Sequence, residues 1–135
     1  MIHKMTFHIY YQDTDAGGIV YHSNYLDYAE RARSELLFDM GLSNTILVEQ
    51  GVAFVLRRVE IDYRKPARLD DLITVETVVV DMKNASMDME QTFLRGEETL
   101  VVVRLQLAFV NPQTLRPIRI PEQIKTLFLK YNKEN

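Results

Sequence analysis

The sequence contains no cysteine. This absence excludes disulfide bonds, metal sites held by thiolates and a cysteine nucleophile. Histidine, aspartate, glutamate and serine are left as the residue types that can carry chemistry. A domain of this length can bury a core of its own. We therefore predict no metal site and no separate cofactor.

The sequence also lacks a long apolar run. Its first residues do not have the hydrophobic stretch of a signal peptide. No segment approaches the roughly 20 apolar residues that cross a bilayer. We expect no transmembrane segment and a cytoplasmic location. The net charge of −3 argues against a general affinity for nucleic acid.

Internal repeats, low-complexity tracts and linkers rich in Gly, Ser or Pro are absent as well. The chain has 135 residues, of which 47% are hydrophobic and 26% charged, an ordinary balance for a globular protein. This length fits one domain. We predict a single domain over residues 1–135.

Apolar residues spaced three and four apart predict one long helix over residues 23–40. Gly41 suits the position just after its end. Such a helix, about 18 residues long, would span roughly 27 Å, which is enough to cross a sheet. The apolar stripe consists of Tyr25, Ala29, Ala32, Leu36 and Met40.

Alternating apolar and polar residues predict five strands. Turns are expected at residues 83–85 and 95–97. We also predict a short helix over residues 43–50 and a C-terminal helix that begins at Pro121. The predicted strands lie at 5–11, around 59–63, and at 72–82, 87–93 and 101–109.

This order is one strand, one long helix, and then four strands in meander-like succession. It predicts an α+β fold in which a five-stranded antiparallel sheet wraps around the long central helix. The outer face and the edges of such a sheet stay uncovered. We therefore expect a homo-oligomer, either a dimer or a tetramer.

The segment from Tyr11 to Leu26 is where the chemistry is expected. It places two carboxylates, Asp13 and Asp15, two glycines and His22 directly before the long helix. A helix start offers unpaired backbone N–H groups and the positive end of the helix dipole. These groups can hold a developing oxyanion while a nearby carboxylate activates water.

Three other interpretations compete for this segment. A calcium loop that starts at Asp13 would need an acidic residue at Asn24, so the EF-hand pattern fails. A serine triad is disfavoured, because the adjacent His22 and Ser23 point in different directions. Asp13 and Asp15 could also be ordinary turn and capping residues, and spacing alone leaves that alternative open.

The run from Tyr11 to Tyr25, followed by Tyr-Ala-Glu-Arg-Ala-Arg at residues 28–33, resembles the signature of the 4-hydroxybenzoyl-CoA thioesterase family. It is most similar to the YbgC-like, Tol-Pal-associated branch of acyl-CoA thioesterases. Residues 54–58 and 63–71 also fit that branch. The resemblance extends from Tyr10 to about Pro121 and implies the hotdog fold.

The resemblance also implies roles for individual residues. Asp15 would be the catalytic carboxylate, acting as general base or as nucleophile. His22 would stand where a backbone N–H polarises the thioester carbonyl, and its ring would aid proton transfer or orientation. Related enzymes are dimers or tetramers with sites between subunits. The acyl and thioester site would be lined by Gly17, Gly18, Ile19, Val20 and Tyr21.

One turn departs from the family pattern. The aryl-CoA relative has a strongly basic cluster between the third and fourth strands, where this chain has only Lys83. Nucleotide binding is therefore expected to use other basic residues as well. The candidates are Lys83, Arg64, Lys65 and Arg68, with Arg57 and Arg58 behind them.

The predicted activity is hydrolysis of an acyl-CoA or acyl-carrier-protein thioester to the free acid, with CoA being part of the substrate. Two alternatives remain at this point. One is a hotdog dehydratase or hydratase that acts on an acyl thioester. The other is a module that binds acyl carriers without turnover.

Overall fold

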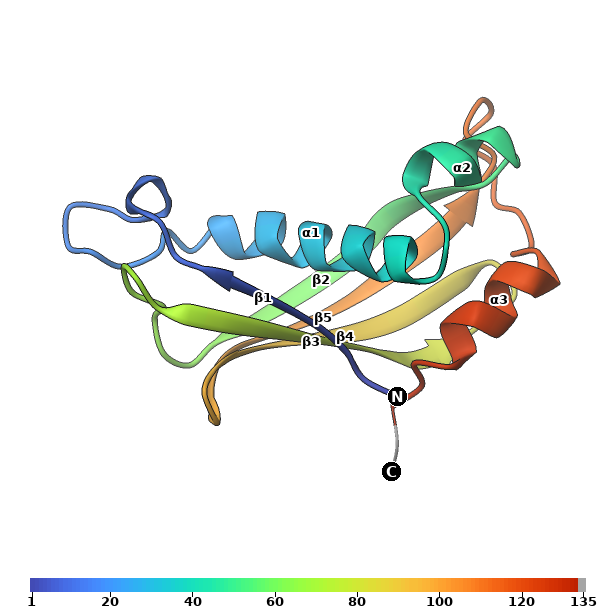
Figure 1. Cartoon of the computed structure of the whole chain (residues 1–135). Helices are drawn as coiled ribbons and strands as arrows, with labels where there is room; N and C mark the ends of the chain where they lie inside the picture. The colour runs from blue at the N-terminus through green and yellow to red at the C-terminus, as the bar shows by residue number, and fades with distance from the viewer. Residues whose placement is uncertain (134–135) are drawn as a thin grey trace.

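The computed structural model of the protein describes residues 1–133, which form one antiparallel five-stranded sheet with a long helix across one face (Figure 1). The spatial order of the strands is β1-β3-β4-β5-β2. The elements are β1 (His3–His8), a 3-10 turn (Tyr11–Asp13), α1 (Asn24–Asp39), α2 (Asn44–Glu49), β2 (Ala53–Tyr63), β3 (Leu72–Met82), β4 (Ser86–Arg95), β5 (Glu98–Val110) and α3 (Glu122–Leu129).

The order of the strands corrects one expectation. β3, β4 and β5 form a meander, but β2 pairs with β5 at the sheet edge instead of preceding β3 in the sheet. The connection over residues 64–71 therefore has to span the width of β5 and β4 before β3 begins. Alternation along a strand shows which side chains share a face, but it carries no information on which strand lies next to it.

The predicted long helix is confirmed, with its first and last residues each one position inside the expected range. Four residues of its stripe are buried, and Met40 packs against the core. The two alanines, Ala29 and Ala32, have no exposed surface, so the helix can approach the sheet closely. On β4 the facing side chains Met87, Met89, Gln91 and Phe93 are buried, as the alternation predicts.

The first strand is shorter than expected and lies earlier in the chain. It ends at His8, and Tyr11 is 82% exposed. The reason is the carboxylate of Asp13, whose Oδ2 accepts a hydrogen bond from the backbone N–H of Tyr10 at 2.8 Å. This bond turns the chain into a 3-10 helix, because a short-range carboxylate acceptor competes with the strand ladder.

The two shorter helices form where they are predicted. Ser43 is the N-cap of α2, and its hydroxyl accepts a hydrogen bond from the N–H of Ile46 at 3.0 Å. Pro121 precedes α3, whose buried residues are Ile124 and Phe128. β2 is longer than expected, beginning at Ala53. Most of its residues are exposed, because no further strand pairs with this edge within residues 1–133.

The loop before α1 and the turn between β3 and β4 lie at opposite ends of the sheet (Figure 1). α1 covers one face, and the other face has no helix over it in the part of the chain that the structure describes. None of the helices within residues 1–133 is long and apolar enough to cross a membrane.

Candidate functional site

The chain folds into a tight turn between Asp15 and Ile19. The N–H of Asp15 donates to the carbonyl of Ile19 at 2.9 Å, and the N–H of Gly18 donates to the carbonyl of Asp15 at 3.0 Å. Gly18 has a φ of 76°, a left-handed conformation that side chains disfavour. The turn therefore depends on glycine at this position.

The carboxylate of Asp15 is held in place by this same turn. Its Oδ1 accepts hydrogen bonds from the N–H of Gly17 at 2.8 Å and from the N–H of Ile19 at 3.4 Å. A Cβ added at Gly17 would lie 3.2 Å from that oxygen. The first of the two adjacent glycines thus provides space for the carboxylate, while Gly18 provides the backbone conformation.

The start of α1 leaves backbone donors available. The N–H of Asn24 is used by the carbonyl of Tyr21 at 3.0 Å, and the side chain of Asn24 donates to the carbonyl of Asp13 at 2.9 Å. Among the described residues, none accepts a hydrogen bond from the backbone N–H of His22 or of Ser23. Two amides at the positive end of the helix dipole are therefore free to bind an oxygen.

Asp15 and the start of α1 line the same hollow, which has a volume of about 300 Å³. Its other walls come from the end of β2 and from the segment that follows it. The lining residues are Asp15, Ile19, Val20, Tyr21, His22, Tyr25, Tyr63, Arg64, Lys65 and Pro66.

Two tyrosines brace the hollow. The hydroxyl of Tyr63 donates to the backbone carbonyl of His22 at 2.9 Å. The rings of Tyr63 and His22 also meet edge to face, with their centroids 6.3 Å apart. The hydroxyl of Tyr25 accepts a hydrogen bond from the N–H of Ala67 at 3.0 Å. These bonds tie the start of α1 to β2 and to the segment after β2. Burial raises the pKa of Tyr25, and the hydrogen bond from the Ala67 N–H opposes this only in part.

Seven of the predicted site residues line this hollow, and four do not. Gly17 and Gly18 build the turn behind it. Arg68 pairs through its backbone with Ile19, so it lies beside the hollow. Lys83 follows β3, which extends roughly 35 Å from the end of the sheet nearest Asp15. Within one chain, Lys83 and Asp15 are therefore far apart. The seven lining residues are Asp15, Ile19, Val20, Tyr21, His22, Arg64 and Lys65.

Sequence reasoning missed three lining residues: Tyr25, Tyr63 and Pro66. Tyr25 belongs to the apolar stripe of the helix and Tyr63 to an alternating strand, so both were assigned to packing. A hydroxyl on an otherwise apolar stripe was the available signal, because a buried tyrosine hydroxyl usually needs a partner. Pro66 had no comparable signal.

The basic residues beside the hollow differ in how they are paired. Arg64 Nε donates to Asp62 at 3.0 Å, and Lys65 forms an ion pair with Glu98. Hydrogen bonds from Lys65 and then from Arg95 lower the pKa of Glu98. The side chain of Arg68 forms no ion pair with any residue in 1–133. It is therefore the basic group here with the most freedom to meet an anion.

Asp13 makes different contacts from Asp15. Its side chain caps the 3-10 turn, and its backbone carbonyl accepts a hydrogen bond from the side-chain amide of Asn24. The buried hydroxyl of Tyr28 faces it, and burial together with the charge of Asp13 raises the pKa of Tyr28. Asp13 therefore stabilises the loop through these hydrogen bonds and does not line the hollow.

Comparison with known proteins identifies the family of this chain. Residues 10–128 match the family described as the thioesterase-like superfamily. The acyl-CoA thioesterase YbgC of Haemophilus influenzae is 41% identical over 121 residues, which cover 89% of each chain. The acyl-CoA thioester hydrolase YbgC of Escherichia coli is 37% identical and covers 89% of this chain and 90% of its own.

A solved structure supports the same grouping. The crystal structure of a probable thioesterase from Bartonella henselae superposes with a TM-score of 0.84 at 38% identity. The match covers 90% of this chain and all of that one. The five-stranded sheet wrapped around α1 is thus a hotdog fold. The chain belongs to the thioesterase-like superfamily and, within it, to the YbgC group.

Proposed function

We propose that this protein hydrolyses acyl-CoA thioesters, with Asp15 as the catalytic carboxylate. One observation carries the proposal: Asp15 and His22 line the same hollow, and the backbone N–H of His22 has no acceptor among the described residues. A thioester carbonyl that accepts from this amide would lie beside the carboxylate. The names of the YbgC relatives support the same activity.

The reaction can be written with the groups that line the hollow. Water adds to the carbonyl carbon while Asp15 accepts its proton, and the negative charge that develops on the carbonyl oxygen is held by the amides of His22 and Ser23. The C–S bond then breaks, and the thiolate of CoA leaves and takes up a proton. In the alternative, the carboxylate of Asp15 attacks the carbonyl carbon, the C–S bond breaks and the CoA thiolate leaves. Water then cleaves the resulting mixed anhydride, which releases the free acid and regenerates the Asp15 carboxylate.

The size of each contribution follows from the type of catalysis. General-base assistance typically accelerates a reaction about 10²- to 10⁴-fold. A single donor to the oxyanion typically contributes about 10²- to 10³-fold. The Gly17 and Ile19 amides fix the orientation of the Asp15 carboxylate, because both donate to its Oδ1.

The remaining features of the proposal concern the substrate and the assembly. Arg64, Lys65 and Arg68 are the candidates for the phosphates of CoA, and an acyl-carrier-protein thioester is the alternative substrate. A homo-oligomer, dimer or tetramer, would bring Lys83 of one copy nearer to Asp15 of another. The proposed location is the cytoplasm, where CoA thioesters are made and used.

The test is an assay for release of free CoA from acyl-CoA, run on the wild-type protein and on Asp15→Asn. We expect Asp15→Asn to lower kcat by at least about 10²-fold. His22→Ala is the comparison variant. It should lower kcat less than Asp15→Asn does, because the proposed donor at this position is the backbone N–H. An equal or larger loss in His22→Ala would give the ring a direct chemical role.

Product analysis separates the alternatives. A dehydratase would form an enoyl thioester without releasing thiol. A carrier-binding module would bind the thioester and leave it intact. Either outcome in the wild-type protein would refute hydrolysis.

A further inference from the structure

A buried polar cluster joins the middle of α1 to the middle of the sheet. It consists of Gln91 on β4, Thr77 on β3, the backbone carbonyl of Ala29 and the guanidinium of Arg33. Gln91 and Thr77 have no exposed surface. Burying a side-chain amide in an apolar core is unfavourable unless its hydrogen bonds are made, so an apolar residue would serve packing alone better.

Gln91 makes these hydrogen bonds, and two of its three partners belong to α1. Its Nε2 donates to the carbonyl of Ala29 at 2.9 Å and to the hydroxyl of Thr77 at 3.2 Å. Its Oε1 accepts a hydrogen bond from Arg33 Nη1 at 3.0 Å. Because both amide hydrogens are used, the oxygen has to face Arg33. One side chain of the sheet therefore holds the helix at two residues about one turn apart.

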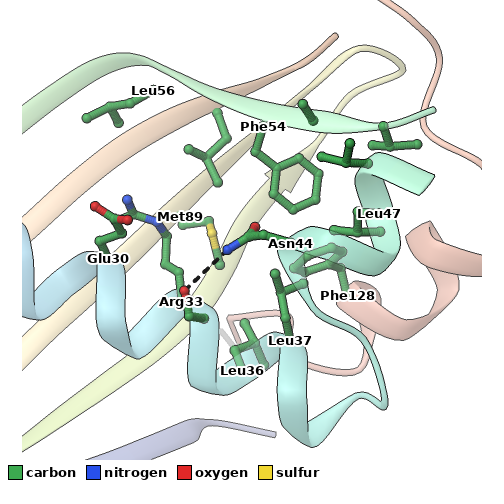
Figure 2. Close-up of a pocket in the computed structure, with 15 residues that line it drawn as sticks. Glu30, Arg33, Leu36, Leu37, Asn44, Leu47, Phe54, Leu56, Met89 and Phe128 are labelled. Carbon is green, nitrogen blue, oxygen red and sulfur yellow. Dashed lines mark hydrogen bonds between the residues drawn. The ribbon is translucent and has the colours of Figure 1, made fainter. Parts of the chain in front are cut away.

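Arg33 turns inward to make its bond with Gln91. A long basic side chain on a helix usually extends its charge into water. Arg33 is instead partly buried, and it lines a second hollow, of about 420 Å³, together with Leu37 and Met89 (Figure 2). Met89 precedes Gln91 by two residues on β4, so both side chains lie on the face of the sheet that α1 covers. The guanidinium thus reaches from the helix to the sheet.

The bonds of Gln91 differ in kind from the other contacts of the buried helix face. That face is mostly apolar and includes Ala29, Ala32 and Leu36. Apolar contacts oppose the separation of helix and sheet, but they have no preferred direction. Hydrogen bonds need donor–acceptor distances of about 2.7–3.2 Å and a favourable angle, so they resist a shift along the helix axis. Gln91 is itself fixed, because β4 lies between β3 and β5.

A shift of α1 along its axis would change the geometry of the site. Asn24, the first residue of α1, lies five residues before Ala29, roughly 7.5 Å along the axis. His22 lies two residues before that start, so a displacement at Ala29 moves its backbone N–H relative to Asp15. A misplacement of about 1 Å can lower a rate about 10²-fold. Tyr63 holds the carbonyl of His22 from β2, and Gln91 holds the helix from β4.

We propose that Gln91 is a positioning residue for thioester hydrolysis. Through its bonds to Ala29 and Arg33 it fixes the axial position of α1, and with it the place of the His22 N–H beside Asp15. Gln91 does not line the Asp15 hollow, so it acts through the helix and not on the substrate. This inference rests on the proposed thioesterase function.

The experiment measures kcat and KM with the acyl-CoA that the wild-type protein hydrolyses fastest. Gln91→Met keeps the length and flexibility of the side chain and removes all three of its hydrogen bonds. We expect kcat to fall about tenfold or more, because the amide and the carboxylate are no longer held in register. KM should change less than kcat, since the residues that line the hollow are unaltered.

Thr77→Val is the matched control. It removes a buried hydroxyl from the same cluster but leaves both bonds between Gln91 and α1 in place. Its melting temperature should fall, as that of Gln91→Met should, because each variant leaves a buried polar group without a partner. Its kcat should stay close to that of the wild type.

Combining Gln91→Met with Thr77→Val separates positioning from stability. Both polar side chains of the sheet are then apolar, and replacing both partners in this way can be nearly neutral for stability. We expect the melting temperature to recover toward that of the wild type while kcat stays low. Recovery of kcat together with the melting temperature would overturn the positioning role.

The remaining outcomes distinguish this inference from the proposed function. If Gln91→Met keeps the wild-type kcat while Asp15→Asn is inactive, or if Thr77→Val lowers kcat as much as Gln91→Met does, the role of Gln91 is refuted and hydrolysis stands. If the wild-type protein releases no CoA, or if Asp15→Asn stays fully active, the proposed function itself fails.

Discussion

Asp13 and Asp15 are two residues apart, yet they occupy different environments. Asp13 turns inward and supports the 3-10 turn and the start of α1. Asp15 lines the same hollow as His22, and its carboxylate is oriented by the amides of Gly17 and Ile19. Spacing alone could not separate these roles, because both positions suit a capping aspartate. The family resemblance assigned the chemistry to Asp15, and the hydrogen bonds of the loop are consistent with it.

Tyr63 is the residue that sequence reasoning missed and that the geometry makes important. Its hydroxyl holds the carbonyl of His22, which belongs to the same peptide unit as the free N–H of Ser23. We predict that Tyr63→Phe lowers kcat about 2- to 10-fold, the equivalent of one ordinary hydrogen bond. The KM for acyl-CoA should change less, because the ring still lines the hollow.

Steady-state kinetics with a thermal melt would test this role. A melting temperature equal to that of the wild type, together with a lower kcat, would indicate lost positioning of the helix start. A kcat equal to that of the wild type would show that the Tyr63 hydroxyl does not contribute.

At the scale of the elements, α1 is the part that positions the site. Its N-terminus carries the free amides, and its buried face packs on the sheet through side chains as small as Ala29 and Ala32. A close approach of helix and sheet keeps the start of α1 beside the end of β2. Packing in the middle of the helix therefore affects geometry at its end.

Ala32→Leu tests that packing. The extra atoms have no space, because Ala32 is fully buried. We expect the free energy of unfolding to fall by about 1–3 kcal/mol, as is typical of overpacked cores. Urea denaturation would measure the change. Arg31→Leu, at the exposed neighbouring position, serves as the control and should stay within about 0.5 kcal/mol of the wild type. Equal stability of both variants would contradict the packing of α1.

Most elements could be predicted from periodicity, and the exceptions have physical reasons. α1, α2 and β3 lie within one residue of their expected ranges, because their caps and alternation are clear. β1 ends early because the Asp13 side chain competes for its backbone. The first half of β2 was missed because its apolar and polar residues do not alternate. Both of its faces are largely exposed in a single chain, so neither face requires apolar side chains.

At the scale of the whole molecule, β2 is an uncovered edge. Along it Val55, Leu56, Val59 and Tyr63 are 36–47% exposed, which is unusual for side chains of this type on a long strand. Unpaired backbone groups on such an edge attract another strand. The same edge borders the Asp15 hollow and a second hollow lined by residues of α1, α2 and β2. We therefore propose that a second copy pairs along β2.

Val59→Glu would test the pairing. A carboxylate facing its counterpart across a two-fold axis should repel it, so we expect the mass in solution to shift toward that of one chain, 15.8 kDa. Analytical ultracentrifugation would measure the mass. Thr6→Glu, an exposed position on the opposite edge strand β1, is the control and should leave the assembly unchanged. An unchanged mass in Val59→Glu would rule out β2 as the interface.

Two features could not be predicted from the sequence alone: the order of the strands in the sheet, and which of the predicted site residues lie together. Alternation assigned side chains to faces but could not place β2 next to β5. Charge suggested Arg64, Lys65 and Arg68, and the family pattern suggested Lys83, whereas the fold places Lys83 at the far end of the sheet from Asp15. Long-range pairing decides both points, and it leaves little trace in local sequence.

The most direct test of the account is the rate of CoA release by Asp15→Asn compared with Asp13→Asn. Asparagine at position 13 keeps the oxygen that caps the 3-10 turn, so that variant should retain most of its activity. Asparagine at position 15 keeps the shape but removes the base, and we expect its kcat to fall by at least about 10²-fold. Equal activity of Asp15→Asn and the wild-type protein, with both folded, would contradict the account.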